Sequence, residues 1–320
     1  SVYNSQPWRW RISATGGVDL YADPDRHLIT TDSQGRDLLL SCGAALHHLT
    51  VALAGLGWAT VTTPLPDPEN LNHLARVQPH GPTPDPGAAR LAPAIQRRHT
   101  DRRRFSPAPV PTEVLDALIE QATAHGAELR AVTDAARGHL IEIITASATL
   151  QQQQLGYAAE LAQWTSRYAH SGDGIQPGSV VGPGVDRPGD VPMRPTPHPE
   201  LTQPPHSFQH LDASVLMVLS TDSDDRRAVL GAGEAMSAVL LTATNLGLAT
   251  TPLSQPLEID QTRTAISTHI VDPERFPQLV LRVGWPYPGA PELPLSPRRT
   301  LDFVLQSPGR SAVGQDPLSR

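Results

Sequence analysis

Lysine is absent from this sequence, because all 25 basic side chains among its 320 residues are arginines. The chain therefore cannot form a lysine Schiff base or use a P-loop lysine, and guanidinium groups, backbone amides or hydroxyls must hold any bound anion. A single cysteine, Cys42, excludes both an internal disulfide and a cysteine-based zinc site. We also expect no metal site at His206 and His210, whose four-residue spacing comes without a partner acid.

Excess positive charge and long apolar runs are also missing. The formal net charge is −7, which argues against a general binder of nucleic acid or anionic membranes, since such proteins need a basic face. No apolar run approaches the roughly 20 residues that a bilayer span needs. Hydrophobic residues make up 39% and aromatic residues 4% of the chain, which is enough for a lean core. We therefore expect a cytoplasmic protein of one large domain or two ordinary ones.

Apolar periodicity predicts alternating helices and strands along most of the chain. Helices are expected over 37–56, 111–124, 137–169 and 228–246, and strands over 8–12, 18–21, 74–77, 213–220 and 278–283. The stretch 171–206 differs, because its 36 positions hold six glycines and nine prolines. We expect it to form no regular element and bury no core, and to be a linker, a disordered loop or a lid.

One part of the sequence resembles another. Residues 43–60 align without gaps on 233–250 with six identities in eighteen positions, and a Thr-Pro-Leu tripeptide follows each copy. Amphipathic helices that end in Leu-Gly resemble each other by chance, but that does not explain the repeated Ala-Thr and Thr-Pro-Leu. The pattern predicts an internal duplication that forms a pseudo-dimer, with a reduced first half at 1–95 and a second half at 96–320.

Three polar segments are candidates for a binding site. The opening run, residues 1–8, carries Asn and Gln amides, which suit a heteroaromatic edge or a polyhydroxyl chain but also occur in ordinary turns. The run 97–104 holds five arginines, which suit a phosphate dianion; the alternatives are a nucleic-acid patch and a solvated helix lead-in. A second arginine pair, Arg298 and Arg299, follows the last core strand and could grip the same phosphate.

These segments, in this order, resemble the FMN-dependent nitroreductase family and, within it, the Acg-like subfamily. The matching motifs are SVYNSQPW at residue 1, RRHTDRRRF at residue 97, LGLATTPL at residue 246 and GWPYP followed by PRR near the end. The resemblance implies an α+β fold with a central sheet flanked by helices, and FMN between two subunits or, in this chain, between two halves. It covers most of the chain except 171–206.

The resemblance also implies roles for particular residues. Ser1, Val2, Asn4 and Ser5 would line the flavin from the first half. Arg98, Thr100 and Arg102 would meet its phosphate from the second half, Leu253 and Ser254 would lie against the isoalloxazine ring, and Arg298 or Arg299 would close on the phosphate. The second half lacks a copy of Asn-Ser-Gln-Pro-Trp, and the first half lacks an arginine-rich opening. These complementary losses predict one complete site per chain, in a monomer or a homodimer.

The family resemblance implies hydride transfer from NAD(P)H through FMN to a nitroaromatic or quinone. Because the flavin performs this chemistry, no side chain is an obligatory acid or base, and we name no catalytic residue. The segment 171–206 falls where the family places part of its active-site cleft. If it covers the ring, the protein is instead a catalytically silent FMN store; if it moves, it is a gating lid.

Overall fold

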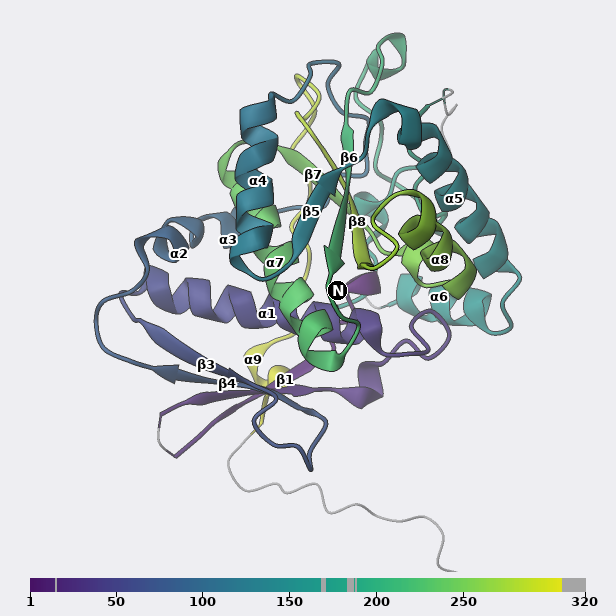
Figure 1. Ribbon diagram of the computed structural model, residues 1–320. Helices are drawn as coiled ribbons and strands as arrows, with labels where there is room; N and C mark the ends of the chain where they lie inside the picture. The colour runs from purple at the N-terminus through teal and green to yellow at the C-terminus, as the bar shows by residue number, and fades with distance from the viewer. Residues whose placement is uncertain (15, 168–170, 183–186, 188, 307–320) are drawn as a thin grey trace, which may run out of the picture.

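Two largely antiparallel sheets enclose a pair of crossing helices in the computed structural model (Figure 1). The structure describes residues 1–14, 16–167, 171–182, 187 and 189–306. The first sheet has the order β3 (Thr60–Pro64), β4 (His73–Pro79), β2 (Val18–Ala22), β1 (Trp8–Ile12) and β9 (Leu305–Gln306). The second sheet has the order β7 (Ala249–Leu253), β8 (Phe276–Gly284), β6 (Val215–Thr221) and β5 (Glu128–Ala131).

The helices are of two sizes. The long ones are α1 (Arg36–Gly55), α4 (Thr112–Ala124), α5 (Asp134–Gln152), α6 (Tyr157–Thr165), α7 (Arg226–Asn245) and α8 (Asp260–His269). The short ones are α2 (Pro86–Leu91), α3 (Ala94–Arg97) and α9 (Leu301–Val304), together with the 3-10 turns η1 (Val2–Asn4), η2 (Pro24–Arg26), η3 (Pro177–Ser179), η4 (Ser207–Gln209) and η5 (Gln255–Leu257). The fold is thus α+β, as the resemblance implies.

The order of strands in the first sheet recurs in the second. The order β3-β4-β2-β1 in the first sheet corresponds to the order β7-β8-β6-β5 in the second. All of these neighbouring strands pair antiparallel. The register recurs as well, because Thr63 pairs with Arg76 as Thr251 pairs with Arg282. Thr63 and Thr251 each begin the Thr-Pro-Leu tripeptide that follows an aligned segment.

The helices α1 and α7 cross at the centre of the molecule through two aligned glycines. Both helices have 20 residues. A Cβ atom on Gly43 would overlap the carbonyl oxygen of Leu230, and one on Gly233 would overlap that of Leu40. The contacts are reciprocal, as they are about a two-fold axis. Only glycine permits so close a backbone approach, so both positions are fixed by packing.

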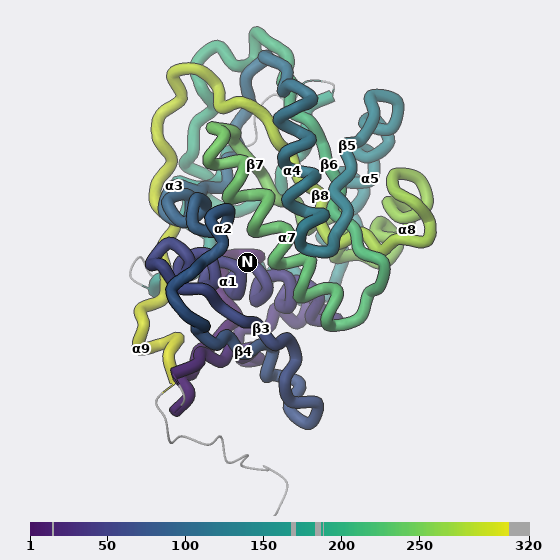
Figure 2. The backbone as a smooth tube through the Cα atoms, turned by 60° about the vertical axis from the view of Figure 1, so that its left-hand side comes forward, coloured from purple at the N-terminus to yellow at the C-terminus, as the bar shows by residue number. Residues whose placement is uncertain are grey.

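The C-terminal segment crosses from the second sheet to the first. After β8 the last described segment runs back alongside the first sheet, where β9 pairs in parallel with β1 (Figure 2). The largest apolar cluster lies between the sheets and combines α1 and α7 residues, among them Leu46 and Leu240, with strand residues such as Leu20 and Leu281. The halves therefore share one core.

Three expectations need correction. The helix expected over 137–169 is two helices, because the chain turns at Gly156 (φ +89°) beside the fully exposed Leu155; residues 168 and 169 lie outside the described part. Helix α1 is long and apolar enough to span a bilayer by composition, with mean hydropathy 1.6, although 56% of its most apolar window is buried as core. It is the one such helix among the described residues.

The third correction concerns 171–206. Its described residues contain only η3 and an isolated bridge between Val181 and Leu201, so it is irregular as expected. It nevertheless buries two valines, Val180 and Val191, against the rest of the molecule. The part of this stretch at 183–186 and 188 lies outside the described residues.

Candidate functional site

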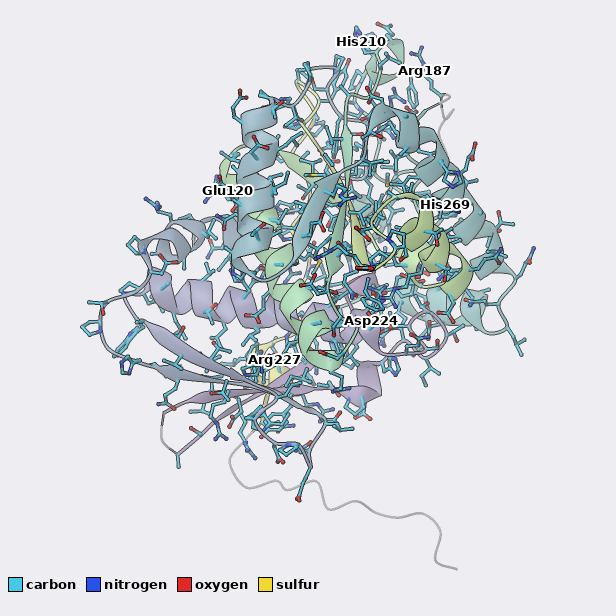
Figure 3. The ribbon with its side chains drawn as sticks, in the orientation of Figure 1. Glu120, Arg187, His210, Asp224, Arg227 and His269 are labelled. Carbon is cyan, nitrogen blue, oxygen red and sulfur yellow. The ribbon has the colours of Figure 1, made fainter. Side chains whose placement is uncertain are left out.

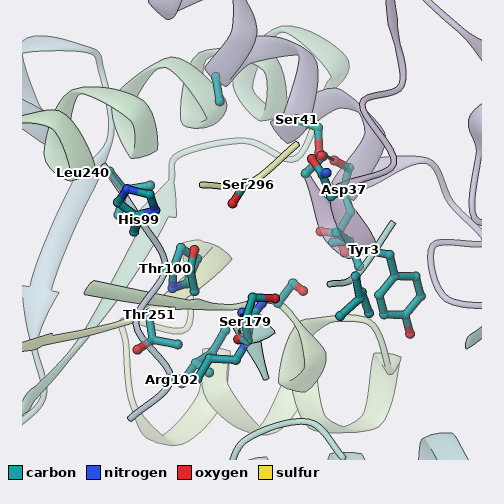
Figure 4. Close-up of a pocket in the computed structure, with 18 of the residues that line it drawn as sticks. Tyr3, Asp37, Ser41, His99, Thr100, Arg102, Ser179, Leu240, Thr251 and Ser296 are labelled. Atoms are coloured by element: carbon teal, nitrogen blue, oxygen red, sulfur yellow. Dashed lines mark hydrogen bonds between the residues drawn. The ribbon is translucent and has the colours of Figure 1, made fainter. Parts of the chain in front are cut away.

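A cavity of about 540 Å³ lies between the two halves (Figure 4). Its walls come from the opening loop and α1 of the first half, and from α7, the arginine run and the end of β7 in the second. The segments 174–180 and 192–196 close another side, and 293–298 completes the lining. The volume is within the range of small-molecule sites, about 300–1,000 Å³.

The opening loop enters the cavity with a tightly bent backbone. Ser1, Val2 and Asn4 line the cavity, and Tyr3, Asn4 and Gln6 have φ between 49° and 53°. Two amides hold this strained backbone: Asn4 Nδ2 donates to Pro297 O (3.1 Å) and Gln6 Nε2 donates to Gly172 O (2.7 Å). The Asn4 side-chain NH2 group therefore already donates a hydrogen bond within the protein, which could not be predicted from the residue type.

Ser5 lies outside the cavity. Its side chain is buried, and its carbonyl oxygen accepts a hydrogen bond from Arg26. Arg26 also forms an ion pair with Asp173, so Ser5 belongs to the anchoring of the loop. The structure thus brings Ser1, Val2 and Asn4 to the cavity but leaves Ser5 behind them.

One face of α1 forms a long wall of the cavity. Asp37, Ser41, Ala44 and His48 recur at three- and four-residue spacings and all line it. Eleven residues separate Asp37 from His48, so this wall extends for about 16 Å. Asp32 secures the start of the helix, where its two carboxylate oxygens accept from the backbone amides of Asp37 (3.0 Å) and Leu38 (2.8 Å).

Positive charge gathers at the His48 end. Arg98 and Arg298 both line the cavity, and neither forms an ion pair within the described part of the chain. Burial, followed by repulsion from Arg298 and Arg102, lowers the pKa of Arg98 to about 10. Burial, followed by repulsion from Arg98 and Arg298, lowers the pKa of His48 to about 3, so the imidazole is neutral. This end has the charge and the donors for an anion.

The other arginines of the run have different contacts. Arg97 is exposed and donates to Asn245 Oδ1 (2.6 Å), whereas Arg103 pairs with Asp101 (2.8 Å). Arg104 pairs with Asp190 of the 171–206 segment. Thr100 and Arg102 line the cavity with Arg98 (Figure 4). Arg102 donates to Ser179 O (2.9 Å), and burial, followed by repulsion from Arg194, lowers its pKa to about 10.

Arg298 and Arg299 also differ in whether they line the cavity. Arg298 lines the cavity, whereas Arg299 turns away and donates to Gln6 O (3.1 Å) and Phe303 O (2.8 Å). It also lies 3.5 Å from an Asp23 carboxylate oxygen. Arg298 is therefore the better placed of the two for a ligand.

Leu253 and Ser254, at the end of β7, both line the cavity. Ser254 Oγ donates to Glu258 Oε1 (2.7 Å) and lies 3.5 Å from a guanidinium nitrogen of Arg194. Of the eleven residues predicted for the site, the structure brings nine to one cavity and excludes Ser5 and Arg299.

The stretch 171–206 is tied across the cavity by a buried ion pair. Arg194 lines the cavity, and its guanidinium forms an ion pair with Glu258 (2.5 Å) and donates to Tyr3 Oη (2.8 Å) and Gln151 Oε1 (3.0 Å). Glu258 has no exposed side-chain surface. We use the term cover for the described residues 171–182 and 189–206.

Sequence reasoning missed four residues at this site: Asp37, His48, Arg194 and Glu258. The spacing of Asp37, Ser41 and His48 on one helical face is a signal that could have found the first two. Arg194 lies in a proline-rich stretch without periodicity, and its partner is 64 residues away, so no local pattern points to it. No group of three or more potential metal-ligating side chains occurs among the described residues.

Comparisons with known proteins show which family this chain belongs to. The Nitroreductase family model matches residues 95–285. "Putative NAD(P)H nitroreductase Rv3131" of Mycobacterium tuberculosis is 41% identical over 315 residues, which cover 96% of this chain and 88% of that protein. "Putative NAD(P)H nitroreductase acg" of the same species is 36% identical over 311 residues, with 95% and 91% covered. The chain therefore belongs to the nitroreductase family, and its expected likeness to Acg is confirmed.

A solved structure is also similar. The FMN-dependent nitroreductase NfnB from Mycobacterium smegmatis, in complex with NADPH, aligns with 68% of this chain and 98% of its own, at a TM-score of 0.41 and 15% identity.

Proposed function

We propose that this chain holds one FMN in the cavity, with the phosphate at the end near Arg98 and the isoalloxazine ring toward Asp37. The observation that carries the proposal is the pair of unneutralised guanidinium groups, Arg98 and Arg298, at one end of a wall about 16 Å long. FMN is elongated, with its dianion at one end and an uncharged ring system at the other. The cavity is likewise elongated, with its positive charge at one end.

Each group of lining residues then has a role. Arg98, Arg298 and the Thr100 hydroxyl would hold the phosphate by charge-assisted hydrogen bonds, and Arg102 would contribute from the same run. Ser1, Val2 and Asn4 would line the flavin from the first half, and Leu253 and Ser254 from the second. Half of the site comes from each half of the chain, so a monomer would carry a complete site.

Bound FMN would supply hydride transfer from NAD(P)H to a nitroaromatic or quinone acceptor. The side chains of this protein would position the ring and keep water from it, and none of them is assigned as an acid or base here. We also propose that the protein is cytoplasmic, where nicotinamide nucleotides would be available as the reductant.

A second function, FMN storage without turnover, is favoured by the cover. Four contacts tie it down: Arg194 with Glu258, Arg102 with Ser179 O, Gln6 with Gly172 O, and Arg104 with Asp190. A cover held in this way would keep nicotinamide from the ring. The two functions share the FMN site and differ only in access to it.

We also infer that the two halves arose by duplication, with boundaries near residues 95 and 96. The repeated strand order and the reciprocal glycine contacts support this inference. Two FMN molecules per purified chain would contradict the single split site, whereas one per chain would agree with it. Sedimentation of the FMN-loaded protein would measure whether it is a monomer or a homodimer.

Anaerobic mixing with NADPH separates the two functions. Rapid bleaching of flavin absorbance would contradict storage, and no bleaching over hours would contradict the nitroreductase. The double change Arg194→Met and Glu258→Gln removes the buried ion pair without leaving an unpaired charge. If the cover limits access, this variant bleaches faster than the wild type.

The matched control is Arg187→Met, which changes an exposed arginine of the same stretch at the periphery of the molecule (Figure 3). It should bleach at the wild-type rate. Equal rates in the double variant and the wild type would show that this ion pair does not control access.

A further inference from the structure

Asp37 is a buried carboxyl group in the cavity wall with one oxygen left without a partner. Its side chain is 3% exposed. Oδ1 accepts a hydrogen bond from Arg36 (2.8 Å), but Oδ2 has no hydrogen-bond partner among the described residues. Figure 4 places Asp37 beside Ser41 on the wall of the cavity. A buried polar atom without a partner costs free energy, and a ligand in the cavity could supply that partner.

Asp37 forms an ion pair with Arg36 through one carboxylate oxygen (2.8 Å), in surroundings that hold more carboxyl than guanidinium groups. Two acids face it, Asp32 from the loop before α1 and Glu258 from the segment after η5, and two guanidinium groups face it, Arg36 from α1 and Arg194 from the cover. The Ser1 amino group of the opening loop also faces Asp37, and burial lowers the pKa of that amine to about 5, so it is neutral at pH 7 to 9. Glu258 is paired with Arg194, and Asp32 accepts from two backbone amides at the start of α1. Arg36 divides its donors between Asp37 and the carbonyl oxygens of Gln278 and Leu257.

We propose that Asp37 donates a hydrogen bond from Oδ2 to an acceptor atom of the flavin ring, and so positions the ring end of the cofactor. This inference rests on the proposed FMN site. Burial, followed by repulsion from Asp32 and Glu258, raises the pKa of Asp37 to about 8 against the opposing effect of Arg36. The carboxyl is therefore mostly protonated at neutral pH and has an O–H to donate. The flavin ring offers carbonyl and imine acceptors.

The affinity for FMN should fall as pH rises, because only the protonated Asp37 carboxyl can donate this hydrogen bond. Affinity is full below the pKa of the free protein and is lost as pH rises through about 8. For one linked proton, the Kd for FMN should rise about tenfold between pH 7 and pH 9. The FMN phosphate stays a dianion over this window, because its second pKa is near 6.

The experiment is a fluorescence titration of the FMN-free protein with FMN from pH 7 to pH 9. The wild type should show the tenfold weakening, and Asp37→Asn should change less than about twofold because the amide does not titrate. The matched control is Glu234→Gln on α7: burial raises the pKa of Glu234 to about 7, but it does not line the cavity. That variant should keep the wild-type slope.

Each outcome bears on one proposal. Parallel profiles for the wild type and Asp37→Asn, or tighter wild-type binding at higher pH, would overturn the role of Asp37 while leaving the FMN site in place. A wild-type protein that binds no FMN at any pH would overturn the site itself. If Asp37→Asn does not fold, calorimetry of the wild type at pH 8 in two buffers should show uptake of about half a proton on FMN binding. No uptake would contradict the inference.

Discussion

The two halves of this molecule share their framework and differ in the side chains that it carries. Strand order, antiparallel pairing and the central helix recur from one half to the other. The second half adds α5, α6 and the cover between β5 and β6, and adds α8 between β7 and β8. Backbone packing is thus alike in the two halves, whereas the segments that line the described cavity are not repeated between them.

The aligned positions of α1 and α7 show where the halves diverge. Asp37, Ser41, Ala44 and His48 of α1 align with Arg227, Gly231, Glu234 and Ala238 of α7. The α1 set lines the cavity and the α7 set does not. The glycines at the crossing are the same in both helices because a backbone contact tolerates no alternative. The backbone contact is therefore the same in both helices, whereas the side chains of α1 that line the cavity differ from those at the aligned positions of α7.

The largest expected difference between the halves concerns two aligned arginines. Arg282 is 2% exposed and pairs with Asp212, whereas Arg76 is 45% exposed and pairs with Asp19. Arg282→Ala should lower the free energy of unfolding by about 3–5 kcal/mol, because it leaves a buried carboxylate unpaired. Arg76→Ala should cost at most about 1 kcal/mol, since water screens the exposed guanidinium and the buried Asp19 keeps His73 as a partner (2.9 Å). Urea denaturation followed by circular dichroism measures both, and equal costs would contradict this comparison.

The helix crossing gives the next largest effect. Gly233→Ala should destabilise the protein by about 3 kcal/mol, because the new methyl group overlaps the Leu40 carbonyl oxygen. Gly231→Ala, two residues away on the same helix, meets no atom within 4 Å and should stabilise it by up to about 1 kcal/mol through helix propensity. The same denaturation experiment applies. A tolerated alanine at 233 would show that the two helices can separate without cost.

Two adjacent arginines sharpen the comparison within the second half. Arg98→Ala should weaken FMN binding by about 2–3 kcal/mol, the value of a charge-assisted hydrogen bond. Arg97→Ala removes the same charge one residue earlier, where the side chain contacts Asn245, and should leave affinity unchanged. Titration with riboflavin, which lacks the phosphate, should not distinguish Arg98→Ala from the wild type. Equal losses with FMN and riboflavin would remove Arg98 from the phosphate site.

The smallest expected effect is the difference in FMN affinity between variants of Arg298 and Arg299. Arg298→Ala should weaken FMN binding by about 1–2 kcal/mol, because it lines the cavity. Arg299→Ala should lower the melting temperature, since Arg299 holds the opening loop through Gln6 O, and should affect FMN affinity less. The reverse order of the two affinities would mean that Arg299 reaches the ligand.

Much of the framework could be predicted from the sequence because its signals are local. The spacing of Leu39, Leu46 and Leu53 predicts α1. The strand at 8–12 follows from the alternation of apolar residues with arginine, and the strand at 278–283 from its apolar run. The break at Gly156 was missed, because an apolar pattern continues on both sides of it. The boundaries of most expected elements agree with the structure within a few residues, but β3, β5, β7 and α8 were not predicted.

The sequence by itself determined the repeated helix and tripeptide, the cluster of arginines and the opening polar loop, since each depends on residues within a few turns of one another. Only the tertiary structure decided which members of these sets meet. Asn4 reaches Pro297 O across 293 residues, and Arg194 reaches Glu258 across 64. Such pairings depend on how two sheets pack against one helix pair, and packing between distant segments leaves no periodic trace in either of them.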